Sequence, residues 1–129
     1  DYQRVLKKLY QEGFCSKSGE PRRKSVWTIF TDKKIIDKFN RTMLLWCNYY
    51  LPVITTKSRI SRIVYILEYS AKHTLANKHH STLTKIMSKM GVQPKACDPQ
   101  GEESTLFNYG SLCQRIRGLH LSGKHWRAV

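Results

Sequence analysis

Acidic residues are scarce in this chain of 129 residues, which contains 9 Asp and Glu against 23 Lys and Arg. The formal net charge of +14 makes a compact state repel itself unless a polyanion neutralises it. Nucleic acid and an anionic membrane surface are the candidate polyanions. Long hydrophobic runs are also missing, and none reaches the length of a membrane span. We therefore expect a nucleic acid as the partner and no membrane.

Closely spaced cysteines are absent as well. The four cysteines lie far apart in the sequence (Cys15, Cys47, Cys97 and Cys113). Free thiols in a reducing compartment are the plain interpretation. The same wide spacing argues against a zinc site built from Cys97, Cys113, His120 and His125. His73, His79 and His80 lack identifiable partner ligands, so we expect neither a metal nor another cofactor.

The chain opens without a secretory signal, because DYQRVLKKL already follows a helical pattern. The two ends can therefore be cuts from a longer protein. A length of 129 residues predicts one core-forming unit. We divide it into a helical domain over residues 1–91 and a linker with a basic C-terminal extension over residues 92–129.

Apolar residues recur at the helical period in several stretches, which predicts a mainly α protein. We expect a small bundle of three to four main helices with an irregular C-terminal extension. The first helix ends at Gly13, and the second is capped by Thr31 or Asp32 and ends at Pro52. Residues 25–31 are rich in β-branched and aromatic side chains, so they form a short strand or an extended connection.

The stretch from Lys57 to Met90 predicts a long two-faced helix, a break and a second helix. One sector of the long helix is apolar and should be buried: Ile60, Ile63, Val64, Leu67, Ala71, Thr74 and Leu75. The opposite sector is basic and carries two rings: Ser58, Arg59, Arg62, Tyr65, Tyr69, Lys72 and His73. Glu68 is the only acid in the stretch, whereas an ordinary solvated face mixes Glu with Lys. This imbalance predicts an anionic partner.

The break between the two helices is the second candidate site. Ser81 is the predicted N-cap of the short helix, whose solvent side carries Lys85 and Lys89. Free amides at a helix N-terminus attract phosphate, and Lys78 adds charge beside them. Lys78, His79 and Ser81 are therefore candidate phosphate contacts. The alternative is a simple turn in which a carbonyl group fixes the His79 tautomer.

Beyond Gly91 the helical pattern weakens. Residues 95–104 combine Pro, Gly and acidic residues, which predicts a linker. A short helix is possible from Ser111 to Leu119.

The segment SRIVYILEYSAKHTLANKHHST, residues 61–82, resembles domain X of group II intron maturases, the thumb region of an intron-encoded reverse transcriptase-like protein. The first half of the match consists of Arg62, Ile63, Tyr65, Ile66, Leu67 and Ser70. The second half consists of Thr74, Leu75, Ala76, Lys78, His79, Ser81 and Thr82. The groups NYY at residues 48–50 and KKLYQEGF at residues 7–14 also resemble family segments, so the resemblance covers residues 1–91.

The resemblance implies a thumb-like helical module that binds structured intron RNA and assists its folding and splicing. The chemistry of splicing would belong to the RNA. The chain has no Asp-Asp motif of the family's polymerase site, so we expect no enzyme activity. A palm or reverse transcriptase domain and other ribonucleoprotein subunits are possible protein partners. The resemblance favours an organelle, a mitochondrion before a chloroplast, with a bacterial cytoplasm as the remaining option.

RNA offers phosphates, 2′-hydroxyls and unpaired bases to a protein. Lys and Arg bind phosphates, and Tyr65 and Tyr69 lie one helical turn apart, where they can stack on unpaired bases or pack against another protein element. Residues 22–24 are either a solvated basic loop or a phosphate contact. The complete set of candidate RNA contacts is Arg22, Arg23, Lys24, Tyr49, Arg59, Arg62, Tyr65, Tyr69, Lys72, His73, Lys78, His79, Ser81, Lys85 and Lys89.

Two other functions are compatible with parts of the same sequence pattern. A structural RNA-binding protein of a larger ribonucleoprotein, such as an organellar ribosome, would show the same charge pattern. A nuclease using His120 and His125 in the tail would need further ligands, and no acid or cysteine lies at a convincing spacing from them.

Overall fold

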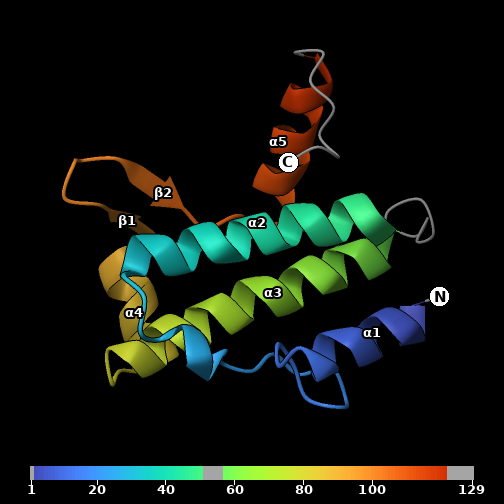
Figure 1. Cartoon of the computed structure of the whole chain (residues 1–129), viewed down its shortest axis with the longest axis horizontal. Helices are drawn as coiled ribbons and strands as arrows, with labels where there is room; N and C mark the ends of the chain where they lie inside the picture. Colours follow the sequence, from blue (N-terminus) through green and yellow to red (C-terminus); the bar gives the residue numbers. More distant parts are fainter. Residues whose placement is uncertain (1, 51–56, 122–129) are drawn as a thin grey trace.

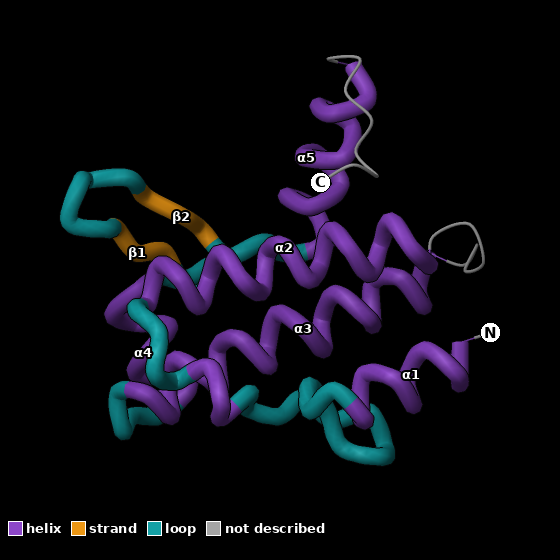
Figure 2. Tube along the Cα trace, in the orientation of Figure 1, coloured by secondary structure: helices purple, strands orange, loops and turns teal. Residues whose placement is uncertain are grey.

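A computed structural model describes residues 2–50 and 57–121 of the chain, and the side chains of residues 2–47 and 57–116. The described elements are α1 (Tyr2–Gln11), η1 (Ser25–Trp27), α2 (Asp32–Tyr50), α3 (Lys57–Lys78), α4 (Leu83–Met90), β1 (Lys95–Cys97), β2 (Glu103–Thr105) and α5 (Tyr109–Leu121). The mainly α prediction is confirmed (Figure 2). Pro52, the predicted end of the second helix, lies outside the described residues. None of the described helices has the length and apolar character needed to cross a membrane.

Helix α3 occupies the middle of the molecule. Figure 1 shows α2 on one side of it, running in the opposite direction, and α1 on the other side. Helix α4 continues from the end of α3, while the β1–β2 hairpin and α5 lie beyond α2 (Figure 1). Because α3 has neighbours on more than one side, ten of its 22 residues are buried.

The predicted apolar face of α3 is largely confirmed. Ile63, Val64, Leu67, Ala71 and Leu75 belong to the core, and Ile60 is partly buried beside it. Burial of such side chains stabilises the fold by about 1.5–3 kcal/mol each. The facing of α3 that the sequence predicted therefore holds for its apolar residues.

The prediction that Lys72 lies on the exposed basic face is wrong. Its side chain is fully buried, and its Nζ lies 2.8 Å from Oε2 of Glu68 and 4.3 Å from the ring centre of Tyr69. Burying an ammonium group is costly unless it is paired, and the carboxylate and the ring provide that pairing. The helical wheel misplaced Lys72 because it assumed a single buried sector, whereas α3 is packed on several sides.

The N-termini of α2 and α4 are each capped by a threonine. The Thr31 hydroxyl accepts a hydrogen bond from the Lys34 amide at 3.3 Å, which confirms one of the two predicted caps of α2. At α4 the Thr82 hydroxyl accepts from the Lys85 amide at 3.2 Å. The prediction of Ser81 as this cap is therefore wrong by one residue. Its own amide donates to the carbonyl of Ala76 at 2.8 Å and so belongs to the end of α3.

Residues 25–31 do not form the strand that was one of two predictions for them. They contain η1, whose Trp27 packs edge-on against Phe39 of α2 and against Phe14, with ring centres 4.9 and 5.8 Å apart. These ring contacts fix the course of the chain between α1 and α2.

The linker predicted over residues 95–104 is instead a β-hairpin. β1 pairs antiparallel with β2, and Cys97 lies opposite Glu103. Asp98 closes the turn by accepting hydrogen bonds from the amides of Gln100 and Glu102 at 3.1 and 2.8 Å. Helix α5 includes the helix predicted at residues 111–119.

The segment predicted as a C-terminal extension contributes to the core. Leu106 and Leu112 are both buried in the same cluster as α2 and α3. Asn40 of α2 holds this segment, because its side chain donates to the Thr105 carbonyl at 2.9 Å and accepts from the Phe107 amide at 2.8 Å.

Candidate nucleic-acid interface

An extended segment over residues 19–24 lies along α3. The carbonyl of Gly19 accepts a hydrogen bond from Arg62 at 3.1 Å, and the carbonyl of Arg22 accepts one from the Ser70 hydroxyl. The amide of Lys24 donates to the Thr74 hydroxyl at 2.8 Å. Twelve helical residues cover about 18 Å, and five extended residues cover about 17 Å. The two therefore run side by side, and the arginine side chains of the segment are exposed.

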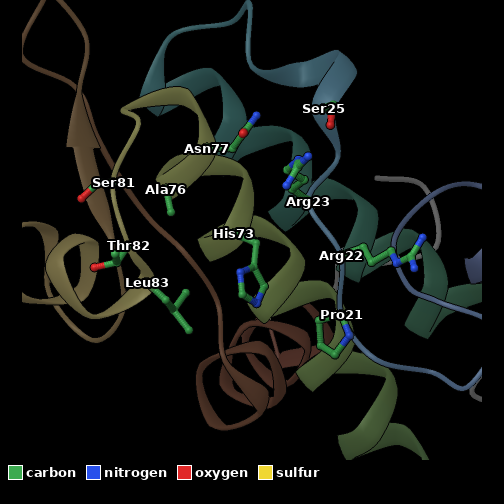
Figure 3. A pocket seen from close by; sticks show the side chains of 10 residues that line it. All are labelled: Pro21, Arg22, Arg23, Ser25, His73, Ala76, Asn77, Ser81, Thr82 and Leu83. Carbon is green, nitrogen blue, oxygen red and sulfur yellow. The ribbon is translucent and has the colours of Figure 1, made fainter.

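A groove opens between this segment, the C-terminal half of α3 and the start of α4 (Figure 3). We call it the basic groove; its volume is about 620 Å³. Its described lining consists of Pro21, Arg22, Arg23, Ser25, His73, Ala76, Asn77, Ser81, Thr82 and Leu83. None of these lining residues is acidic. The groove thus brings together four of the predicted RNA contacts, Arg22, Arg23, His73 and Ser81.

The charges in the basic groove are not neutralised within the described part of the chain. Arg22 and Arg23 are exposed, and neither forms an ion pair with a described acid. Burial, and then the charge of Arg23, lower the pKa of His73 below its ordinary value of 6.5. The imidazole of His73 is therefore neutral at pH 7, and the groove carries its positive charge on the two guanidinium groups.

Lys78 and His79 are held by an acid that the sequence did not link to them. Asp32, at the start of α2, accepts a hydrogen bond from Nζ of Lys78 at 2.9 Å, and Nε2 of His79 lies 2.8 Å from the same oxygen. Burial alone would raise the pKa of Asp32, but the hydrogen bonds and charges of these two partners lower it. We call this three-residue contact the Asp32 clamp. The Asp32 clamp attaches the turn between α3 and α4 to the start of α2. Neither Lys78 nor His79 lines the basic groove.

Lys24 is separated from the two arginines that precede it. Its ammonium donates to the carbonyl of Glu12 and lies 4.5 Å from the ring centre of Phe14 and 5.3 Å from that of Trp27. Burial lowers the pKa of Lys24. The structure therefore divides the predicted basic run into one residue with internal contacts and two exposed guanidinium groups.

The tyrosines of α3 form a stack with the cations beside them. The ring centres of Tyr65 and Tyr69 are 4.5 Å apart, and the guanidinium of Arg62 lies 4.8 Å from the centre of Tyr65. Tyr65 is 40% exposed, so one of the two predicted rings is accessible. Arg59 similarly lies 5.2 Å from the ring centre of Tyr2 in α1. The exposed ring of Tyr65 can therefore stack on an RNA base or pack against another protein element.

The remaining predicted contacts are spread more widely. Lys85 and Lys89 are exposed on α4. The side chain of Tyr49 lies outside the described residues, as do the side chain of His120 and all of His125. Among the described residues no group of three or more His, Cys, Asp and Glu side chains could hold a metal ion.

Four of the described acidic residues lie near the hairpin, away from the basic groove. Asp98, Glu102 and Glu103 belong to the hairpin region beside α2, where Asp37 also pairs with Lys33 at 2.8 Å. In Figure 1 the hairpin and the segment before η1 lie on opposite sides of the α2–α3 pair. These four acids therefore do not neutralise the arginines of the basic groove.

Comparison with known proteins agrees with the resemblance seen in the sequence. The model of the type II intron maturase family matches residues 2–117, well beyond residue 91, where the resemblance was expected to end. Maturase K of Palhinhaea cernua is 40% identical over 109 residues, which cover 81% of this chain and 20% of the relative. Maturase K of Wolffia arrhiza is 38% identical over 89 residues, covering 69% and 17%. No solved structure matches the chain.

These relatives correct the predicted localisation and assign the family. The matched maturase K proteins come from plants and are encoded in chloroplasts, so the preference for a mitochondrion is wrong and the relatives point to a plastid. The chain spans about a fifth of the length of these relatives. Because the family model covers most of its residues, the chain belongs to the type II intron maturase family.

Proposed function

We propose that this chain binds structured group II intron RNA and assists its folding for splicing. The observation that carries the proposal is the basic groove, in which two exposed arginines form no ion pair with a described acid. Membership of the maturase family supports intron RNA as the ligand. The RNA would perform the splicing chemistry, so no residue of the chain is assigned a catalytic role.

Phosphate binding is the chemistry that the arginines suit best. A guanidinium group presents several N–H donors in a planar fork, which matches the oxygens of a phosphate. Double-stranded RNA is recognised mainly by its shape and backbone, so phosphate contacts can dominate the affinity. Lys85 and Lys89 would extend this contact along α4, because both are exposed on the helix that begins at the groove.

The test is a titration of the chain with folded intron RNA at several salt concentrations. In the double variant Arg22→Ala/Arg23→Ala the slope of log Kd against log salt should fall by about two units if both side chains bind phosphate. The matched control is Arg41→Ala/Lys95→Ala, which removes the same charge from exposed positions near the hairpin. Equal slopes for the two double variants would contradict the proposal, because the effect would then follow net charge alone.

Copurification separates this function from a structural role in a larger ribonucleoprotein. A single intron species bound to the chain supports the maturase function. Stoichiometric ribosomal RNA would instead favour the structural role and contradict the proposal. The wider partnership with a palm-like domain of the same protein stays a prediction of the family resemblance.

A further inference from the structure

We propose that the basic groove is a pocket for one unpaired nucleotide of the RNA. Its phosphate would lie at the arginines and its base beside His73. The inference rests on the proposed function and deepens it, since it names single-stranded nucleotide, rather than duplex backbone alone, as the ligand of this groove.

The size and shape of the groove fit such a ligand. Its volume of about 620 Å³ lies within the range of roughly 300–1,000 Å³ that is usual for small-molecule pockets. Figure 3 shows the His73 side chain between Leu83 on one side and Pro21 on the other. A flat base inserted here would contact the His73 ring and the apolar side chains of Pro21 and Leu83.

The lining residues divide into a part suited to a base and a part suited to a phosphate. His73 is uncharged at pH 7, so its ring can stack on a base, and the nitrogen atoms of its ring supply one donor and one acceptor. The amide of Asn77 adds donors and an acceptor of the kind that recognise the edges of bases. Arg22 and Arg23 supply the positive charge for a phosphate, and the hydroxyl-bearing residues Ser81 and Thr82 line the groove at the start of α4.

Both walls of the groove are fixed before a ligand arrives. The arginine-bearing wall is tied to α3 by the hydrogen bonds of Ser70 and Thr74. The opposite wall, at residues 81–83, follows directly after the Asp32 clamp, which ties Lys78 and His79 to α2. A pre-formed site loses less entropy when it binds its ligand.

This arrangement also gives a physical account of the segment that carries the family resemblance. Thr74 anchors one wall, Ala76 leaves space as a small side chain, and the pair at residues 78–79 forms the clamp. Ser81 and Thr82 complete the other wall. Lys78 and His79 are therefore assigned as positioning residues, although the sequence predicted that they bind RNA directly.

The test compares two single-stranded probes that differ only in their bases. One is a uridine hexamer, and the other is a hexamer of the same ribose phosphate backbone without bases. If a base enters the groove, the wild-type chain should bind the uridine hexamer about five-fold more tightly or better, which is the lower end of the effect of base stacking. His73→Ala should remove this preference and leave the salt dependence unchanged. The matched control is His80→Ala, since His80 is exposed and does not line the groove.

Each outcome decides the inference. A preference for the uridine hexamer that is lost in His73→Ala and kept in His80→Ala supports the pocket. Equal affinity of the wild-type chain for both probes, or no binding of either, overturns it. A preference that survives in His73→Ala overturns the assignment to this groove. Failure of the wider function is seen separately, in the titration with folded intron RNA. Far-ultraviolet circular dichroism tests whether each variant keeps its helices.

Discussion

Replacing the acid of the Asp32 clamp should loosen the connection between α3 and α4. Asp32→Asn keeps the size of the side chain and one acceptor oxygen but removes the negative charge that binds Lys78 and His79. A hydrogen bond to a charged group contributes about 1.5–3 kcal/mol when it is well shielded. The side chains of Asp32 and Lys78 are each 26% exposed, so solvent weakens this contribution.

We therefore expect Asp32→Asn to lower the free energy of unfolding by about 1–2 kcal/mol. For a domain of this size, that corresponds to a drop in Tm of about 3–10 °C. Urea denaturation followed by circular dichroism measures the free energy directly. The matched control is Glu20→Gln, because this carboxylate is 73% exposed and lies 3.8 Å from Arg62. Its loss should cost less than about 0.5 kcal/mol.

The pH dependence provides an independent test of the same contact. The pKa of Asp32 in the folded chain is below its ordinary value of 3.8. The charged carboxylate therefore stabilises the folded state at pH values above 3.8, and this contribution is lost as the pH falls through the lowered pKa. The difference between wild type and Asp32→Asn should therefore shrink as the pH falls below 3.8. A difference that is absent at pH 7, or that does not change in acid, would refute the clamp.

Three further outcomes follow from burial. Leu67→Ala should lower the free energy of unfolding by about 2–4 kcal/mol, because Leu67 is fully buried, and an unchanged urea midpoint would contradict the facing of α3. Lys72→Met should lower the free energy of unfolding by about 2–4 kcal/mol, because it leaves Glu68 unpaired. Adding Glu68→Gln to this variant should recover most of the lost stability, and no recovery would argue against the buried pair. Burial, and to a lesser extent Cys113, raise the pKa of Cys47 to about 12. Iodoacetamide at pH 8 should therefore label the exposed Cys97 before Cys47. Early labelling of Cys47, detected by mass spectrometry, would refute its burial.

Local patterns in the sequence predicted the structure correctly where it depends on one helix alone, on its buried face or its cap. The period of the apolar residues predicted the buried face of α3, and the threonine at the start of α2 predicted its cap. The same reasoning missed the cap of α4 by one residue, because Ser81 and Thr82 are adjacent and both are common caps. It also missed the hairpin, because the strands at residues 95–97 and 103–105 are only three residues long and show little alternation.

The candidate site was predicted only in part. The sequence identified Arg22, Arg23, His73 and Ser81 as separate candidates, but these residues are up to 59 positions apart and nothing in their spacing showed that they share one groove. Asp32 looked like an ordinary acid in the first turn of a helix, where acids are favoured by the helix dipole. Its contacts with Lys78 and His79 span 46 and 47 positions, so no local signal could have revealed them.

By itself, the sequence determined the properties of the protein that do not depend on how the helices are arranged in space. These are the excess of positive charge, the helical periods, and the family to which the segment at residues 61–82 belongs. Only the tertiary structure decided which cations face solvent. Lys72 and Lys24 are occupied by internal partners, whereas Arg22 and Arg23 stay exposed because the extended segment along α3 is held by its backbone and not by its arginine side chains. Whether a charge is available to a ligand depends on the neighbours that folding places around it, and those neighbours come from distant parts of the chain.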